Sequence, residues 1–192
     1  MMKPVTQHPM SPRTQLTRDD IHAALKAVAA GLERRGLSGE LCLFGGSVMV
    51  LVYAARVATK DVDALFQPAS PILEIAAQVA ATQSLPDDWL NDGVKGYLPA
   101  RHEVTADELP QFPSLKLTMP VPEYLLAMKC LAARLGGAAG EPSDVEDIRT
   151  LINELRIKTS GEVLDLVSRY YPAGRIPVKT QYLEGMFEEG TP

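Results

Sequence analysis

The sequence has few of the residues that build metal centres from sulfur and nitrogen, and it has no long apolar run. Two cysteines, Cys42 and Cys130, and three histidines are scattered along 192 residues, so no spacing typical of a zinc site occurs. Both cysteines stand in apolar segments, which predicts buried free thiols and suits a reducing cytosol. No apolar run reaches the roughly 20 residues that a membrane-spanning helix needs. We therefore expect a cytoplasmic protein without a membrane segment.

The charge balance is acidic. Twenty-four Asp and Glu residues against 19 Lys and Arg residues give a formal net charge of -5. This balance argues against a protein that grips nucleic acid through bulk electrostatics, although a local basic strip is compatible with it. Hydrophobic residues make up 46% of the chain, which is enough material for a packed core.

Hydrophobic periodicity predicts alternating helices and strands in the first half and helices in the second. The expected helices are 17–36, 47–56, 71–84, 121–137, 141–157 and 161–172, and the expected strands are 40–44, 61–66 and 115–120. This order predicts an α/β (α+β) fold with a small mixed sheet and a helical C-terminal part. We expect a flexible tail at 1–15, a core at 16–120, a helical subdomain at 121–175 and a tail at 176–192.

A glycine turn, Gly45-Gly46-Ser47, separates an expected strand from an expected helix. Glycines let the backbone approach an anion closely, and the free amides at the start of a helix favour negative charge. Ser47 could add a hydroxyl donor. The turn therefore indicates a phosphate site, although a glycine pair before a helix also serves as ordinary turn chemistry.

Two aspartates follow on the next expected strand, as Asp61-Val62-Asp63. Residues i and i+2 of a strand point to the same face, so both carboxylates project side by side while Val62 enters the core. Neighbouring carboxylates repel each other and need a cation, and hard oxygen ligands without His or Cys suit Mg²⁺ or Mn²⁺. The alternative is an edge strand whose aspartates face water.

The glycine turn followed by Asp-x-Asp resembles the signature of the DNA polymerase β-like nucleotidyltransferase superfamily. Within it, the chain is similar to AbiEii-type toxin nucleotidyltransferases and to a related group of uncharacterised bacterial domains. The closer likeness rests on "TKDVDALF", "WLNDGVKGYL", and "PEYLLAMKCLAAR" followed by "DVEDI", and it covers about residues 20 to 155. The resemblance implies a polymerase β-like nucleotidyltransferase core that transfers a nucleoside monophosphate from an NTP to a hydroxyl acceptor with the help of Mg²⁺.

The resemblance also implies roles for individual residues. The phosphates would lie against Gly45, Gly46 and Ser47, and the metal ions would be held by Asp61 and Asp63. Lys129, on the helix expected at 121–137, would neutralise phosphate charge, and Arg134, five residues later on that helix, is a further nucleotide-binding candidate. Lys129 could equally be an ordinary surface lysine, but its apolar neighbours leave little exposed helix face there.

Three further assignments stay open. Asp144 and Asp147 lie one turn apart near a helix start, where they either complete the catalytic site or only complement the helix dipole. Asn91, close to Trp89 and Lys95, either contacts the base or ribose of a nucleotide or is a polar neighbour of a core tryptophan.

The chain departs from the superfamily pattern at one point. Many relatives carry a third carboxylate on a later strand, but "LKLTMP" offers Lys116 and no acid. Either Asp144 or Asp147 takes over part of that work, or the protein is an inactive nucleotide-binding or antitoxin-like module. A kinase finds no support, because no lysine-bearing phosphate loop is present.

The acceptor is not identified by the sequence. Transfer RNA, a protein side chain and a small molecule such as an aminoglycoside are candidates, and an antitoxin is a possible partner. A basic strip of Lys95, Arg101, Lys129 and Arg134 could serve RNA binding.

Overall fold

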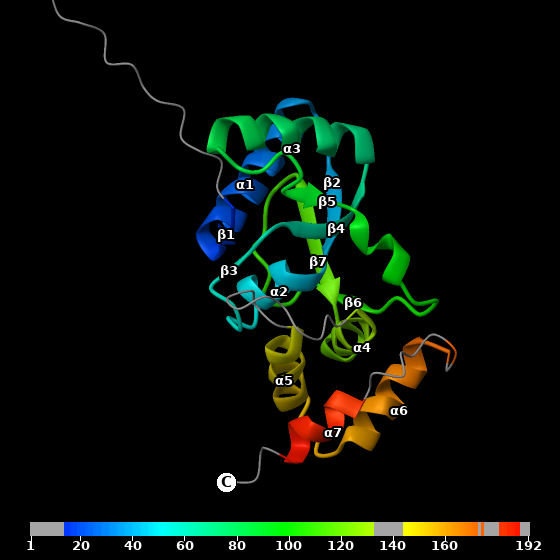
Figure 1. Ribbon diagram of the computed structural model, residues 1–192. Helices are drawn as coiled ribbons and strands as arrows, with labels where there is room; N and C mark the ends of the chain where they lie inside the picture. Colours follow the sequence, from blue (N-terminus) through cyan, green and yellow to red (C-terminus); the bar gives the residue numbers. More distant parts are fainter. Residues whose placement is uncertain (1–13, 133–143, 173, 175–180, 189–192) are drawn as a thin grey trace, which may run out of the picture.

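The computed structural model describes residues 14–132, 144–172, 174 and 181–188 (Figure 1). The helices are α1 (Arg18–Arg34), α2 (Gly45–Leu51), α3 (Ala69–Gln83), the 3-10 helix η1 (Gly93–Tyr97), α4 (Pro122–Ala132), α5 (Asp144–Glu154), α6 (Ser160–Tyr170) and α7 (Gln181–Glu188). The strands are β1 (Leu16–Thr17), β2 (Gly39–Leu43), β3 (Ala58–Thr59), β4 (Val62–Gln67), β5 (Leu90–Asn91), β6 (Val104–Thr105) and β7 (Leu115–Pro120). The predicted mixed α/β class is thus confirmed.

Helix α1 forms where its caps and apolar stripe predict it. Thr17 is the N-cap, and it exchanges hydrogen bonds with Asp20 in a complete capping box. Gly36, with a φ of +63°, follows the helix end in the left-handed conformation that glycine adopts readily. The stripe is fully buried, with 0% exposure at Ile21, Leu25, Val28 and Leu32.

The main sheet has five strands in the order β5-β4-β2-β7-β6. The central strand β2 pairs antiparallel with β4 and parallel with β7, and β4 pairs parallel with the short β5. Helices α1 and α3 pack against each other and contact β7 and β4 respectively. The carboxyl ends of β2 and β7 and the start of β4 therefore meet at the same end of the sheet.

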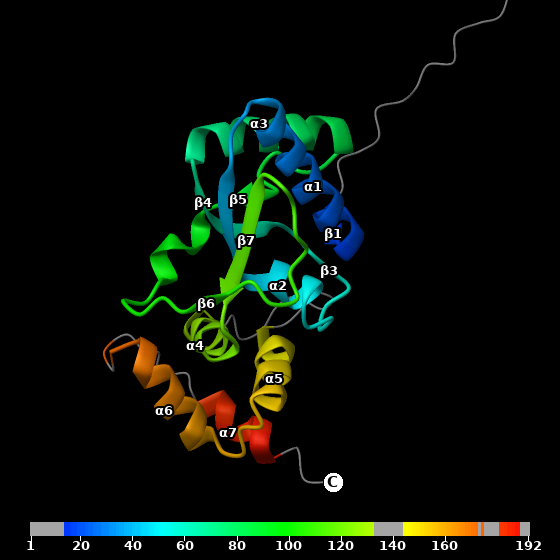
Figure 2. The ribbon, with the colours of Figure 1, turned by 180° about the vertical axis from the view of Figure 1, so that it is seen from behind.

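The C-terminal helices gather at that end. Helix α4 packs against α5 and α6, and α7 packs against α6. Both views place these helices beyond the end of the sheet, with α2 between them and the strands (Figures 1 and 2). Tyr124 of α4 and Tyr170 of α6 stack with their ring centroids 5.3 Å apart. The helical C-terminal part expected from the sequence is present in the described residues.

Two segments differ from the prediction. The helix expected at 47–56 begins at Gly45 and ends at Leu51. Ala54 has a φ of +50°, a left-handed conformation that a right-handed helix cannot include, so the expected helix is shortened. The tail expected at 176–192 contains α7, which buries Leu183 completely. Residues 1–13 of the expected tail lie outside the described residues, as do residues 133–137 of the helix expected at 121–137 and residues 141–143 of the helix expected at 141–157.

The described part of the chain contains no helix that is both long and apolar enough to cross a membrane.

Candidate active site

The glycine turn joins β2 to α2 and lies against the Asp-x-Asp strand. The Phe44 amide donates a hydrogen bond to the Asp63 carbonyl oxygen at 2.8 Å, which ties the turn to β4. Gly45 has a φ of +61°, and a Cβ added there would lie 3.1 Å from the Asp63 Oδ2 atom. Glycine is therefore required at position 45 both for its backbone conformation and for the close approach of the carboxylate.

Gly46 is required for a different reason. A Cβ added to it would lie 2.3 Å from the Thr59 Oγ1 atom, closer than any side chain can sit. Its neighbour Ser47 is fully buried, and its hydroxyl donates to the Phe44 carbonyl oxygen at 2.8 Å. The predicted phosphate contact of Ser47 would require that hydroxyl to leave this bond. Helix α2 has only seven residues, so backbone amides rather than a long helix dipole would attract an anion here.

Asp61 and Asp63 flank Val62, which is fully buried, while both aspartates are half-buried. A Cβ added at Gly45 or at Gly93 would meet one oxygen of Asp63, Oδ2 at 3.1 Å or Oδ1 at 3.7 Å respectively. The Asp63 carboxylate thus lies between Gly45, the first residue of α2, and Gly93, the first residue of η1. We call this arrangement of Gly45, Gly93 and the Asp63 carboxylate the cradle.

Asn91 belongs to the same cradle. It pairs with Asp63 across β4 and β5, and its Nδ2 atom donates to the Asp61 Oδ2 atom at 3.1 Å. Its Oδ1 atom accepts from the Gly93 amide at 2.9 Å. Asn91 therefore orients one of the two aspartates, a role that the sequence reading did not assign to it.

The donor set fits Mg²⁺ better than a metal that needs a complete protein cage. No group of three or more His, Cys, Asp or Glu side chains suited to a metal ion occurs among the described residues. Mg²⁺ commonly binds through one or two carboxylates, with water and substrate phosphates completing its shell. Asp61 and Asp63, beside an accessible glycine backbone, offer that arrangement.

Lys129 is buried, with 8% of its surface exposed, on a face of α4 that packs against α5. Its ammonium lies 2.5 Å from Oδ2 of Asp147 and 3.3 Å from Oδ1 of Asp144. The expectation that the lysine has little exposed helix face is confirmed. Its charge is already opposed by both of the aspartates that were considered for a catalytic role.

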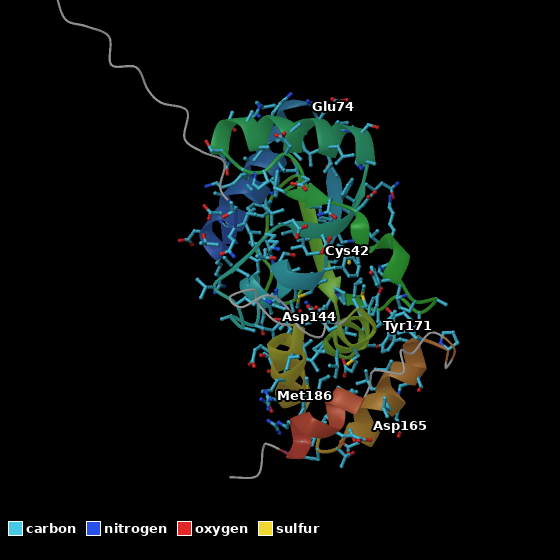
Figure 3. All side chains as sticks on the ribbon, in the orientation of Figure 1. Cys42, Glu74, Asp144, Asp165, Tyr171 and Met186 are labelled. Atoms are coloured by element: carbon cyan, nitrogen blue, oxygen red, sulfur yellow. The ribbon has the colours of Figure 1, made fainter. Side chains whose placement is uncertain are left out.

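Arg56 is the residue that the sequence reading missed. Its Nε atom lies 2.6 Å from Oδ1 of Asp147, and its Nη2 atom lies 3.4 Å from Oδ1 of Asp144. Its Nη1 atom is 3.7 Å from the place where a Cβ of Gly46 would stand. Arg56 therefore connects the glycine turn to the two aspartates of α5, and Figure 3 labels Asp144 near the end of α5 that faces α2.

We call Arg56, Lys129, Asp144 and Asp147 the charge cluster. Two cations and two anions sum to zero charge, which is the condition under which such groups tolerate burial. Asp147 has 0% exposure, and its Oδ2 atom accepts no hydrogen bond, so the ion pair with Lys129 is what compensates that oxygen. The cluster joins the glycine turn to the C-terminal helices through charge.

The remaining predicted residues lie elsewhere. Trp89 is fully buried and its indole N–H donates to the Ala76 carbonyl oxygen at 3.0 Å, so it is a core tryptophan. Exposed Lys95 pairs with Asp92. Because Lys129 is buried, it cannot belong to the exposed basic strip that was considered for RNA binding. Arg134 lies outside the described residues.

Strand β7 provides no third acid beside the aspartates. Lys116 pairs with Glu40 and Thr118 with Cys42 across β2 and β7. Burial raises the pKa of the Cys42 thiol to about 11, while a side-chain hydrogen bond with Thr118 opposes the shift. Both cysteines are buried thiols that form no disulfide, as predicted. Burial also raises the pKa of Tyr53 to about 12.

Comparison with models of protein families, with curated proteins and with solved structures finds no match for this chain.

Proposed function

We propose that the protein is a metal-dependent nucleotidyltransferase that moves a nucleoside monophosphate from an NTP to a hydroxyl acceptor. The observation that carries the proposal is the cradle around Asp63, where two glycine backbones flank a carboxylate that has Asp61 two residues away. Phosphate chemistry needs accessible amides and hard oxygen ligands next to each other. The toxin of a toxin–antitoxin pair is the biological role that fits the sequence resemblance.

Each group then has a defined task. The amides of Gly45 and Gly46 face the phosphates, and Asn91 holds Asp61 in orientation. Mg²⁺, held by Asp61 and Asp63, would supply charge neutralisation at the phosphates. The acceptor oxygen forms a bond to the α-phosphorus while the bond to the β-phosphate bridging oxygen breaks and pyrophosphate leaves. The hydroxyl proton passes to a carboxylate oxygen of the Asp-x-Asp pair. Positioning and electrostatics carry the rate, as in other phosphoryl transfers.

The test is incubation with each α-labelled NTP, Mg²⁺, and cell RNA, cell protein or aminoglycosides as acceptors. We expect label transfer by the wild type and a loss of at least 100-fold in the Asp61→Asn, Asp63→Asn double variant, roughly the effect of removing a main electrostatic group. Asp165→Asn, on the exposed surface of α6, changes the net charge by half as much and should leave transfer unchanged. No transfer by the wild type with any NTP and acceptor contradicts the proposal, as does full transfer by the double variant.

A second candidate is an inactive nucleotide-binding or antitoxin-like module. The absence of an acid on β7 and the existing neutralisation of Lys129 favour it. Calorimetry separates the two functions. An active enzyme should bind NTP in a manner that depends on a divalent ion, whereas an interaction module should instead retain a protein partner that the aspartate substitutions do not release.

A further inference from the structure

Asp144 and Asp147 face the same two cations in unequal ways. Asp147 uses both oxygens, at 2.6 Å from Arg56 Nε and 2.5 Å from Lys129 Nζ, and its side chain has 0% exposure. Asp144 contacts these cations through Oδ1, at 3.4 Å from Arg56 Nη2 and 3.3 Å from Lys129 Nζ, and its side chain is 21% exposed. Asp147 therefore bridges the two cations at short distances and is inaccessible to water, whereas Asp144 bridges them at longer distances and is partly accessible to water.

The position of the Asp144 Oδ1 atom is also one that suits an oxygen of a phosphate. A guanidinium and an ammonium on two sides of one anionic oxygen is a common way to hold a phosphate. The same guanidinium borders the glycine turn, with Nη1 at 3.7 Å from the Cβ position of Gly46. A phosphate resting on the turn would therefore adjoin the two cations.

Charge balance decides what must happen when such an anion arrives. The charge cluster is neutral as it stands, so a phosphate that adds to it would place a third anion against two cations. The Asp147 carboxylate cannot exchange its two ion pairs for contacts with water, because its side chain is fully buried. Asp144 is in contact with solvent, and turning its carboxylate into water recovers most of its hydration.

We propose that Arg56 and Lys129 form a phosphate-receiving pair in which Asp144 is a displaceable occupant and Asp147 a permanent counter-ion. A phosphate group of a nucleoside triphosphate takes the place of the Asp144 carboxylate, and Asp147 keeps both cations in position. Arg56 is then a phosphate-binding residue, and Asp147 is a positioning residue. The identity of the ligand as a triphosphate rests on the proposed function, whereas the displacement itself does not require transfer.

The experiment is calorimetric titration with inorganic tripolyphosphate and, separately, with ATP, each with Mg²⁺ at fixed ionic strength. Asp144→Asn removes the carboxylate charge that competes with phosphate for Arg56 and Lys129, so it should tighten tripolyphosphate binding about tenfold. This value is expected if the Asp144 carboxylate has left the two cations in roughly one wild-type molecule in ten. Glu146→Gln is the matched control, because it removes one negative charge from an exposed position of the same helix. It should change the affinity less than twofold.

A second variant tests whether the gain depends on the cation pair. In the double variant Asp144→Asn, Arg56→Met, the tenfold gain should disappear, because the receiving pair has lost its guanidinium. An equal gain in Glu146→Gln would show a mere effect of net charge and would overturn the inference. Weaker binding by Asp144→Asn, or a gain that survives Arg56→Met, would overturn it as well.

Failure of this inference and failure of the proposed function give different results. If the wild type transfers no label but Asp144→Asn binds tripolyphosphate tenfold more tightly, the displacement stands and the enzymatic proposal falls. If the wild type transfers label while Asp144→Asn binds no more tightly, the enzymatic proposal stands and the displacement falls. If neither probe binds any variant, both fall.

Discussion

Asp147 should be among the most costly side chains in the protein to neutralise. Its side chain is completely buried, and its partners Arg56 and Lys129 are themselves only 12% and 10% exposed. Removing one member of a buried ion pair typically costs about 3–5 kcal/mol, because the opposite charge stays buried without compensation. Asp144 remains within 3.4 Å of both cations and recovers part of that loss. We expect Asp147→Asn to lower the free energy of unfolding by about 3 kcal/mol.

The assay is urea unfolding followed by the fluorescence of Trp89. It is the sole tryptophan in the sequence, it is fully buried, and its indole is bonded to α3 rather than to the charge cluster. A loss of about 3 kcal/mol in a chain of this size lowers the melting temperature by about 6–12 °C. Asp165→Asn, labelled on α6 in Figure 3, is the exposed control and should change stability by less than about 0.5 kcal/mol.

The comparison with Asp144 makes the prediction sharp. Asp144 is partly exposed and its contacts are long, so Asp144→Asn should cost less than about 1 kcal/mol. The reasoning would be refuted by an Asp147→Asn variant as stable as the wild type, or by an Asp144→Asn variant that loses more stability than Asp147→Asn does.

Three further predictions follow from single contacts. Gly46→Ala should destabilise the fold by about 1–3 kcal/mol in urea unfolding, because the new Cβ would lie 2.3 Å from Thr59 Oγ1. Adding Thr59→Ala to this variant should restore part of the lost stability. A Gly46→Ala variant as stable as the wild type would contradict the close packing. Iodoacetamide should modify Cys42 very slowly in the native protein at pH 8, because burial raises the pKa of the thiol to about 11; peptide mass spectrometry measures the rate of modification. The stability that this raised pKa contributes is complete below pH 9.0 and is lost as the pH rises toward 11. The hydrogen bond from the Tyr170 hydroxyl is the main cause of the lowered pKa of Glu103, so Tyr170→Phe should raise that pKa in an NMR titration. An unchanged pKa would rule out the bond as the cause. The stability that the lowered pKa contributes is present above pH 4.5, the usual pKa, and is lost as the pH falls through the lowered pKa.

The sequence was informative wherever a local rule decides the structure. Periodicity predicts a helix at 17–36, and the structure has α1 there, with Thr17 and Asp20 forming both halves of a capping box. The pleat of a strand predicts that Val62 enters the core between Asp61 and Asp63, and the structure has Val62 fully buried with both aspartates half-buried, although β4 begins only at Val62. These features depend on neighbours within a few residues, so periodicity and capping chemistry are sufficient to find them.

Features that depend on distant partners escaped the sequence. Arg56 is the last residue of the helix expected at 47–56, and only its contact with Asp147, 91 residues later, reveals its position in the charge cluster. Trp89 remained ambiguous until the Ala76 carbonyl oxygen was seen to accept its N–H. The catalytic and nucleotide-binding assignments themselves remain predictions, because geometry brings groups together without recording what they bind.

The charge cluster also sets an order in which the molecule can be completed during synthesis. Arg56 and Lys129 leave the ribosome before Asp144 and Asp147, so a growing chain first holds two cations whose counter-ions have not yet been made. Burying those cations without their carboxylates is unfavourable, and α4 can therefore dock with Lys129 inward only after α5 has emerged. The end of the sheet that carries the glycine turn is therefore closed only after α5 has been synthesised, and a phosphate site that includes the cluster would be withheld until then.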